Sequence, residues 1–272
     1  MKGRVLIVAG SDSGGGAGIQ ADIKTVTMLD AFAATAITAL TAQNTRGVFG
    51  ILPIAPDFIR QQIEVVLDDI GADAVKTGML HDAAVIETVA AVLRERAPTV
   101  PLVLDPVMVA KGGAPLIEPD AIDALRHLLI PHAAVLTPNL PEAEILCGRT
   151  IGDIAAMQAA GDALLALGCR AVLVKGGHLP GDELHDVLVT TSGIRVWHSQ
   201  RIDSRHTHGT GCTLASAIAA GLAQGMAVEA AVERARDYVR RAIAGAPGIG
   251  HGHGPLDHAH PLRRQSPGFA GS

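Results

Sequence analysis

The stretch 206–222, HTHGTGCTLASAIAAGL, places a cysteine directly after Gly-Thr-Gly and directly before a run of small and apolar residues that predicts a helix. The predicted helix begins with the backbone amides of Gly209, Thr210, Gly211 and Cys212. Amides at a helix N-terminus lack intrahelical partners, and the helix dipole there amounts to about half a positive charge, so the terminus favours bound anions. The same field lowers the pKa of a thiol from about 8.5, which makes Cys212 a candidate proton acceptor beside an anion. A helix cap with nothing bound and a buried structural thiol are the simpler alternatives.

Unusual residues also recur at the ends of predicted strands. The segments are GSDSGGGAG (10–18), TAQNT (41–45), KTGML (76–80), DPVM (105–108), TPNLPE (137–142) and KGGH (175–178). Ligands of open α/β sheets bind outside the carboxyl ends of the strands, so this recurrence favours an anion hole over an empty cap at 209–212. The first segment lacks the GxGxxG spacing of a dinucleotide site and the Gly-Lys-Ser/Thr ending of a P-loop.

The elements that must position these segments alternate along the chain. Buried strands are predicted at 4–10, 34–40, 73–78, 101–106, 133–138 and 171–177, and helices at 17–29, 56–70, 82–96, 119–130 and 153–167. Short apolar runs separated by helices predict a mostly parallel sheet that is covered on both faces. Two β-like runs around Ser192-Gly193 predict an antiparallel hairpin over 184–198, and helices at 211–224 and 227–244 close the domain.

Length and composition restrict the domain organisation. The chain has 272 residues, enough for one large domain, which we place at 1–245. The remaining residues, 246–272, are rich in Gly, Pro and His without periodicity and predict a mobile tail whose histidines are solvated. The uncharged run 206–228 is as long as a membrane span, but it opens with polar and small residues, which favours a buried helix.

Charge and cysteine content exclude other classes of protein. The net charge is -5 and only 2% of the residues are aromatic, so neither a basic surface nor the stacking platforms for nucleic acid are expected. The three cysteines are Cys147, Cys169 and Cys212. Their odd number and the lack of CxxC spacing argue against a disulfide framework or a zinc cluster, and fit a reducing cytoplasm.

Taken in order over residues 3–245, these motifs resemble the ribokinase-like family of small-molecule kinases. Within it they resemble the hydroxymethylpyrimidine/phosphomethylpyrimidine kinases of thiamine synthesis. The motifs that carry the resemblance are AGSDSGGGAGIQADIKT (9–25), ALTAQNT (39–45), KTGML (76–80), LDPVMVAKGG (104–113), TPNLPEAE (137–144), VLVKGGH (172–178) and GTGC (209–212). The resemblance implies a three-layer α/β/α fold, ATP and Mg²⁺ as cofactors, a homodimer and a cytoplasmic location. It implies phosphorylation of 4-amino-5-hydroxymethyl-2-methylpyrimidine and then of its monophosphate, both in one site.

Phosphoryl transfer needs positioning, neutralisation of the γ-phosphate charge and an acceptor for the hydroxyl proton. The resemblance implies that Cys212 is the proton acceptor, that residues 209–212 bind the phosphate, and that Lys175 and Thr210 contact the nucleotide. It also implies that Asp105 and Glu142 hold Mg²⁺, directly or through water. A turn or cap role for Asp105, and a first-turn helix charge for Glu142, stay open as alternatives. Lys76 ends another strand and has no chemical role in the resemblance.

Substrate contacts are expected near the N-terminal motifs. Gln43 offers an amide that matches one donor and one acceptor of an aminopyrimidine edge. Asp22 and the backbone of Gly10 add polar contacts, and Met79 and Val107 cover the flat ring, with core filling as the alternative for Met79. The residue types support a small heteroaromatic alcohol, and the resemblance alone names the pyrimidine.

Two other functions remain open at this point. A pyridoxal or pyridoxine kinase shares the fold, and kinetics with both alcohols would separate the two kinases. A non-catalytic pyrimidine-binding module is a third hypothesis. The intact set of Asp105, Glu142, Lys175 and GTGC argues against lost catalysis, and pyrimidine-dependent ATP consumption would test it.

Overall fold

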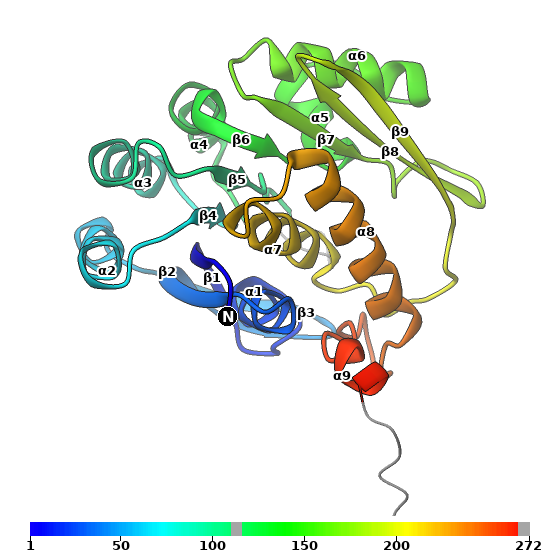
Figure 1. Cartoon of the computed structure of the whole chain (residues 1–272), viewed down its shortest axis with the longest axis horizontal. Helices are drawn as coiled ribbons and strands as arrows, with labels where there is room; N and C mark the ends of the chain where they lie inside the picture. The colour runs from blue at the N-terminus through cyan, green and yellow to red at the C-terminus, as the bar shows by residue number, and fades with distance from the viewer. Residues whose placement is uncertain (110–115, 266–272) are drawn as a thin grey trace, which may run out of the picture.

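The structure is a computed structural model and describes residues 1–109 and 116–265 (Figure 1). Within these described residues, nine strands form one sheet: β1 Arg4–Asp12, β2 Phe32–Asn44, β3 Gly47–Pro53, β4 Ala74–Thr77, β5 Leu102–Leu104, β6 Ala133–Leu136, β7 Ala171–Lys175, β8 Glu183–Thr190 and β9 Gly193–Gln200. Their order across the sheet is β3-β2-β1-β4-β5-β6-β7-β8-β9. The six strands from β2 to β7 in that order are parallel, so their carboxyl ends lie along one edge.

Helices cover both faces of this sheet, as the alternating pattern predicts. They are α1 Gly18–Met28, α2 Pro56–Asp69, α3 Ala83–Arg96, α4 Pro119–Ala124, α5 Leu140–Cys147, α6 Ile154–Leu165, α7 Thr210–Ala223, α8 Val228–Ala244 and α9 His260–Gln265. A π turn at Leu125–Leu129 and a 3₁₀ turn at Ile130–His132 continue α4. The α2–α6 helices pack on one face and α1, α7 and α8 on the other, so the predicted α/β/α layers are confirmed.

The core explains why the strands are short and apolar. Val5 and Ile7 of β1 face one apolar cluster while Leu6 and Val8 face the other, and all four side chains are fully buried. Successive side chains of a strand point to opposite faces, so a strand covered on both faces must be apolar throughout. The sequence pattern of the parallel strands is therefore a direct consequence of the two helical layers.

The antiparallel strands show where the sequence was less informative. The hairpin predicted at 184–198 is confirmed as β8 and β9, which pair from Glu183 to Gln200. Strand β3 was not predicted; it follows a short turn after β2 and pairs antiparallel to it. Phe49 and Leu52 of β3 are 72% and 61% exposed, so this edge strand lacks the buried apolar pattern that identified the other strands.

The prediction of a mobile tail from residue 246 is wrong for residues 246–265. Leu256 and His258 are buried, the Asp257 amide donates to the Ala242 carbonyl at 2.9 Å, and the Tyr238 hydroxyl donates to the His258 carbonyl at 2.7 Å. Contacts with other elements order this segment, so its own lack of periodicity carried no information about its packing. Residues 266–272, the rest of the predicted tail, lie outside the described residues.

The uncharged run 206–228 forms the loop before α7 and α7 itself, which is buried in the domain. No helix in the described ranges has both the length and the apolarity that a membrane span requires.

Candidate active site

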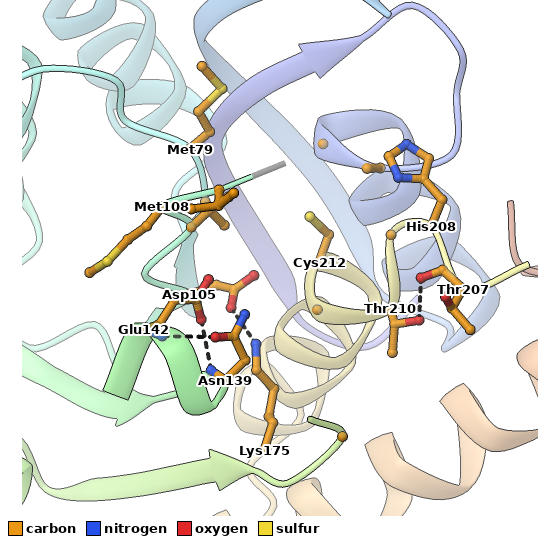
Figure 2. A pocket seen from close by; sticks show the side chains of 18 of the residues that line it. Met79, Asp105, Met108, Asn139, Glu142, Lys175, Thr207, His208, Thr210 and Cys212 are labelled. Atoms are coloured by element: carbon orange, nitrogen blue, oxygen red, sulfur yellow. Dashed lines mark hydrogen bonds and ion pairs between the residues drawn. The ribbon is translucent and has the colours of Figure 1, made fainter. Parts of the chain in front are cut away.

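A cavity of about 1050 Å³ opens at the carboxyl ends of the parallel strands, between the loops after β1, β2, β4, β5, β6 and β7 and the start of α7. Every site residue predicted from the sequence except Asp22 lines it: Gly10, Gln43, Met79, Asp105, Val107, Glu142, Lys175, Gly209, Thr210, Gly211 and Cys212. Residues up to about 200 positions apart in sequence therefore meet in one space (Figure 2). The volume is at the upper end of what small-molecule pockets occupy, which leaves room for two ligands.

The start of α7 has the geometry of an anion site. Gly209 is the N-cap, with a left-handed backbone (φ +82°), and a Cβ at this position would collide with the carbonyl oxygen of Gly16. The Thr210 hydroxyl donates to the Thr207 carbonyl at 2.7 Å, which fixes the turn before the helix (Figure 2). The first amides of α7 are thus exposed to the cavity beside the glycine-rich loop after β1.

A lysine and a carboxylate face this helix start. The Lys175 ammonium lies 3.0 Å from Oδ1 of Asp105, and Thr137 donates to the same oxygen at 3.0 Å. A Cβ on Gly211 would lie 3.3 Å from the Lys175 ammonium and 3.5 Å from Oδ2 of Asp105. Only a residue without a side chain keeps this gap between α7 and the charged pair open. The arrangement leaves room there for phosphate oxygens, which are small and negatively charged.

The donor set around Asp105 fits a divalent cation. Asp105 and Glu142 are 2% and 6% exposed. Glu142 lies in the first turn of α5, where its Oε2 accepts a hydrogen bond from the backbone N–H of Asn139 at 2.8 Å. Burial, together with the nearby negative charge of Asp105, raises the pKa of Glu142 to about 7. A bound cation would offset the negative charge of two buried carboxylates, and oxygen donors are those that magnesium prefers. Glu142 therefore combines the place in the first turn of a helix that we left open with a position suited to metal binding.

The environment of Cys212 differs from the sequence prediction. Burial raises the pKa of its thiol to about 12, and the charges of Asp22 and Asp105 add to that rise, while Lys76 opposes it. The expected lowering of the Cys212 pKa is therefore wrong for the protein without ligands, because burial disfavours the charged form of the thiol. Cys212 is half-buried, and its side chain points into the cavity between the N-terminal strands and Asp105 (Figure 2).

Asp22 does not reach the cavity, and its predicted contact with substrate is wrong. Its carboxylate is fully buried, pairs with the Lys76 ammonium at 2.8 Å, and accepts the Ser216 hydroxyl at 2.7 Å. Lys76 is itself fully buried, yet it lines the cavity floor next to Cys212. Burial opposes its charge, but Asp22, Cys212 and Asp105 together raise the pKa of Lys76, so it stays an ammonium. The sequence offered a signal for Lys76, namely a lysine within a buried strand, but none for its partner.

Lys76→Met should lower the free energy of unfolding by about 3 kcal/mol, because removing one partner of a buried ion pair leaves the other charge uncompensated. Urea denaturation followed by circular dichroism measures this change. The double variant Lys76→Met/Asp22→Asn should recover much of the loss, since no buried charge is then unpaired. An unchanged urea midpoint for Lys76→Met would contradict the pairing.

The remaining predicted residues line the cavity from the ends of β1 and β2 and from the loops after β4 and β5. Gln43, on β2, is half-buried and lines the cavity, as does Val107 after β5. Met79 is 8% exposed and packs in a small cluster with Ala39 and Leu116, and a Cβ on Gly10 would lie 3.2 Å from its sulfur. Met79 therefore fills the core and also presents its surface to the cavity.

A carboxylate–histidine pair in the cavity wall, Asp12 with His208, was also missed in the sequence-based predictions. Asp12, after β1, is 2% exposed, and its carboxylate lies 2.9 Å from Nε2 of His208, just before the GTG segment. Both belong to motifs that the sequence singled out, but the pairing of an N-terminal loop with a residue 196 positions away has no sequence signal.

Known proteins are similar to this chain over nearly its whole length. The sequence profile of the phosphomethylpyrimidine kinase family matches residues 12–257. The chain is 47% identical over 256 residues to the hydroxymethylpyrimidine/phosphomethylpyrimidine kinase of Bacillus subtilis, and the match covers 94% of each protein. The chain belongs to the phosphomethylpyrimidine kinase family. The predicted family is thereby confirmed, and the family match extends past residue 245 into the segment that packs against α8.

Another relative and two solved structures are similar to this chain over most of its length. The chain is 51% identical over 257 residues to the thiamine biosynthesis bifunctional protein ThiED of Geobacter sulfurreducens. The match covers 94% of this chain and 52% of ThiED, so this chain spans about half the length of ThiED. The crystal structure of phosphomethylpyrimidine kinase from Clostridium difficile 630 superposes with a TM-score of 0.80 at 41% identity, covering 89% of this chain and all of that one. The ADP complex of Bacillus subtilis pyridoxal kinase superposes with a TM-score of 0.88 at 36% identity, covering 97% of this chain and all of the other.

Proposed function

We propose that this chain phosphorylates 4-amino-5-hydroxymethyl-2-methylpyrimidine with ATP, and then phosphorylates the monophosphate, in the cavity described above. It is a phosphotransferase of the hydroxymethylpyrimidine/phosphomethylpyrimidine kinase type in thiamine biosynthesis. The observation that carries the residue assignment is that the GTGC helix start, the Lys175–Asp105 pair and the Gln43 amide line one cavity. An anion hole, a charged pair and a heterocycle-reading amide in one space are what transfer from ATP to a small heteroaromatic alcohol requires.

Different residues of the chain have different roles in the proposed reaction. The amides of residues 209–212 and the Lys175 ammonium bind the transferred phosphate and take up the charge that develops on its oxygens. The hydroxymethyl oxygen attacks the γ-phosphorus, the bond from that phosphorus to the β,γ-bridging oxygen breaks, and ADP leaves. The hydroxyl proton passes to Cys212, which must be in its thiolate form to accept it. Asp105 and Glu142 would hold Mg²⁺, which when bound offsets negative charge on the phosphates.

A pyridoxal kinase activity is the second candidate, favoured by the close superposition on the pyridoxal kinase of Bacillus subtilis. Relatives at 44–48% identity are hydroxymethylpyrimidine/phosphomethylpyrimidine kinases, which supports the pyrimidine as the main substrate. Incubation with ATP and Mg²⁺, followed by mass analysis, tests both. We expect mono- and diphosphate from the pyrimidine alcohol, with lower kcat/KM for pyridoxal. Exclusive phosphorylation of pyridoxal would overturn the proposal.

Gln43→Ala should lower kcat/KM for the pyrimidine about tenfold or more, the scale of one lost buried hydrogen bond. The KM for ATP should change little, because the proposed contacts of Gln43 are with the pyrimidine and not with the nucleotide. Steady-state kinetics with each substrate varied in turn measures both constants. An unaltered pyrimidine kcat/KM would remove Gln43 from the substrate site.

The homodimer and the cytoplasmic location stay predictions. The exposed Phe49 and Leu52 of edge strand β3 support an apolar contact between two copies of the chain. Sedimentation analysis of the protein with and without a Phe49→Ser change would test that contact.

A further inference from the structure

Asp12, His208 and Gln43 form a chain of polar contacts along the cavity wall. Nε2 of His208 lies 2.9 Å from Oδ2 of Asp12 and 3.2 Å from the Gln43 amide. Asp12 is 2% exposed and His208 is 8% exposed, and all three residues line the cavity. The substrate-reading amide of Gln43 is thus in direct contact with the residue that precedes the GTGC segment.

Asp12 accepts hydrogen bonds and has none to give. The backbone amides of Gly14, Gly16 and Ala17 donate to its two oxygens at 2.7, 3.0 and 2.8 Å. Burial opposes its ionisation, but the hydrogen bonds from His208 and these amides lower the pKa of Asp12 below its ordinary value. A carboxylate has no hydrogen, so His208 must carry one on Nε2 to make the 2.9 Å contact, whether its ring is neutral or charged.

This proton decides which way the Gln43 amide faces. The oxygen and nitrogen of an amide are nearly equal in size, and their placement follows from the hydrogens around them. The structure draws the amide nitrogen of Gln43 toward His208, an orientation in which two N–H groups oppose each other across 3.2 Å. With the amide oxygen there, it shares the Nε2 hydrogen with Asp12 in a three-centre hydrogen bond.

The other side of the amide gives the same answer independently. The Thr41 hydroxyl lies 2.9 Å from the Ser11 carbonyl oxygen. It lies 3.2 Å from the other polar atom of the Gln43 side-chain amide, which the structure draws as the oxygen. It has one hydrogen, which cannot serve two acceptors fully. If the amide atom that faces Thr41 is the nitrogen, the Thr41 hydroxyl donates to the Ser11 carbonyl and accepts from the Gln43 amide. One orientation of the amide therefore satisfies both neighbours.

We propose that Asp12 and His208 are positioning residues: they hold the Gln43 amide with its oxygen toward His208 and its nitrogen toward Thr41, and so turn the hydroxymethyl group of the substrate toward Cys212. This rests on the proposed function, in which Gln43 reads the pyrimidine edge. Each amide atom keeps one free group, a lone pair on the oxygen and an N–H on the nitrogen. The exocyclic amine at C4 then lies on the His208 side, and ring nitrogen N3 on the Thr41 side.

The order of substituents on the ring makes this orientation productive. In 4-amino-5-hydroxymethyl-2-methylpyrimidine the amine lies between N3 and the carbon that carries the hydroxymethyl group. An amine on the His208 side therefore places the hydroxymethyl group further toward the α7 start, where Gly209 follows His208 and Cys212 lies in the first turn (Figure 2). The opposite amide orientation would place the reacting hydroxyl on the Thr41 side, away from the thiol.

The analogue 5-hydroxymethyl-2-methylpyrimidin-4-one tests the orientation, since it presents an acceptor at C4 and a donor at N3. The wild-type protein should prefer the amino compound by about 100-fold in kcat/KM, because the analogue leaves buried polar groups unpaired. His208→Leu removes the donor, so the preference should fall at least tenfold while the KM for ATP stays within about twofold. His208→Gln supplies an amide N–H and should keep the preference within about threefold of the wild type. His127→Leu, on the exposed side of the helical segment after α4, is the matched control.

Two further measurements keep the outcome decisive. Calorimetric binding of both alcohols without ATP gives the same preference independently of turnover, and Gln43→Ala should abolish that preference. Nitrogen-15 NMR of the wild-type protein, assigned by comparison with His208→Gln, should show a hydrogen on Nε2 of His208 at pH 7. An Nε2 without hydrogen, or an unchanged preference in His208→Leu, would overturn the proposal. If instead Gln43→Ala leaves pyrimidine binding intact, the assignment of Gln43 under the proposed function is what fails.

Discussion

Cys212→Ser is expected to lower kcat by about 10²- to 10⁴-fold, the usual range for losing a general base. Serine keeps the approximate shape of the side chain, but a hydroxyl ionises at a far higher pH than a thiol in the same surroundings. The backbone amides of residues 209–212 remain in place, so the affinity for ATP should change little. Turnover measured from pH 6 to 9 in parallel for both proteins checks this. A near-native kcat in the serine variant would leave Cys212 as a packing residue and assign the hydroxyl proton to phosphate or solvent.

The pH dependence of the wild-type protein follows from the same environment. Burial raises the pKa of Cys212 to about 12 and that of Glu142 to about 7 in the protein without ligands. Both groups act in their deprotonated forms, and kcat/KM reports the free enzyme, so kcat/KM should rise with pH from 6 through 9. The charge of Asp105 contributes to the raised pKa of Cys212, so cancelling that charge when ligands bind lowers it. The profile of kcat should therefore level off at a lower pH than that of kcat/KM.

Asp105→Asn is expected to lower kcat by about 10³-fold, because a cation site at phosphate oxygens contributes several kcal/mol of transition-state stabilisation. The variant also leaves Lys175 without its ionic partner at 3.0 Å. Half-maximal activity should require a higher Mg²⁺ concentration, measured by titration at fixed ATP. Thermal unfolding should shift by only a few degrees, since asparagine retains the shape and can still accept the Thr137 hydrogen bond.

The control for this change is Asp68→Asn, which removes a carboxylate from an exposed ion pair with Arg96 on the surface. It should leave both kcat and the Mg²⁺ requirement as they are in the wild type. Full activity of the wild-type protein in excess EDTA would sink the metal assignment for Asp105 and Glu142 together.

Much of the fold was determined by the sequence alone. Apolar runs such as 4–10 and 171–177 are buried on both faces, and that burial leaves a pattern that needs no partner to be recognised. The glycines and charges at strand ends were equally readable, because parallel strands bring their carboxyl ends to one edge. Asp105, Lys175 and residues 209–212 were accordingly placed in one site before any contact was known.

Only the tertiary structure decided which partner each polar group meets. Asp22 pairs with Lys76, 54 positions away, and Asp12 with His208, 196 positions away; no local pattern encodes such contacts. It also decided the state of Cys212, since the helix terminus is visible in the sequence while the loss of water around the thiol is not. Residues 246–265 are held by hydrogen bonds to other elements, so their order does not arise from their own sequence. The sequence specifies local patterns and chemical types, whereas desolvation and long-range pairing depend on the whole assembled domain.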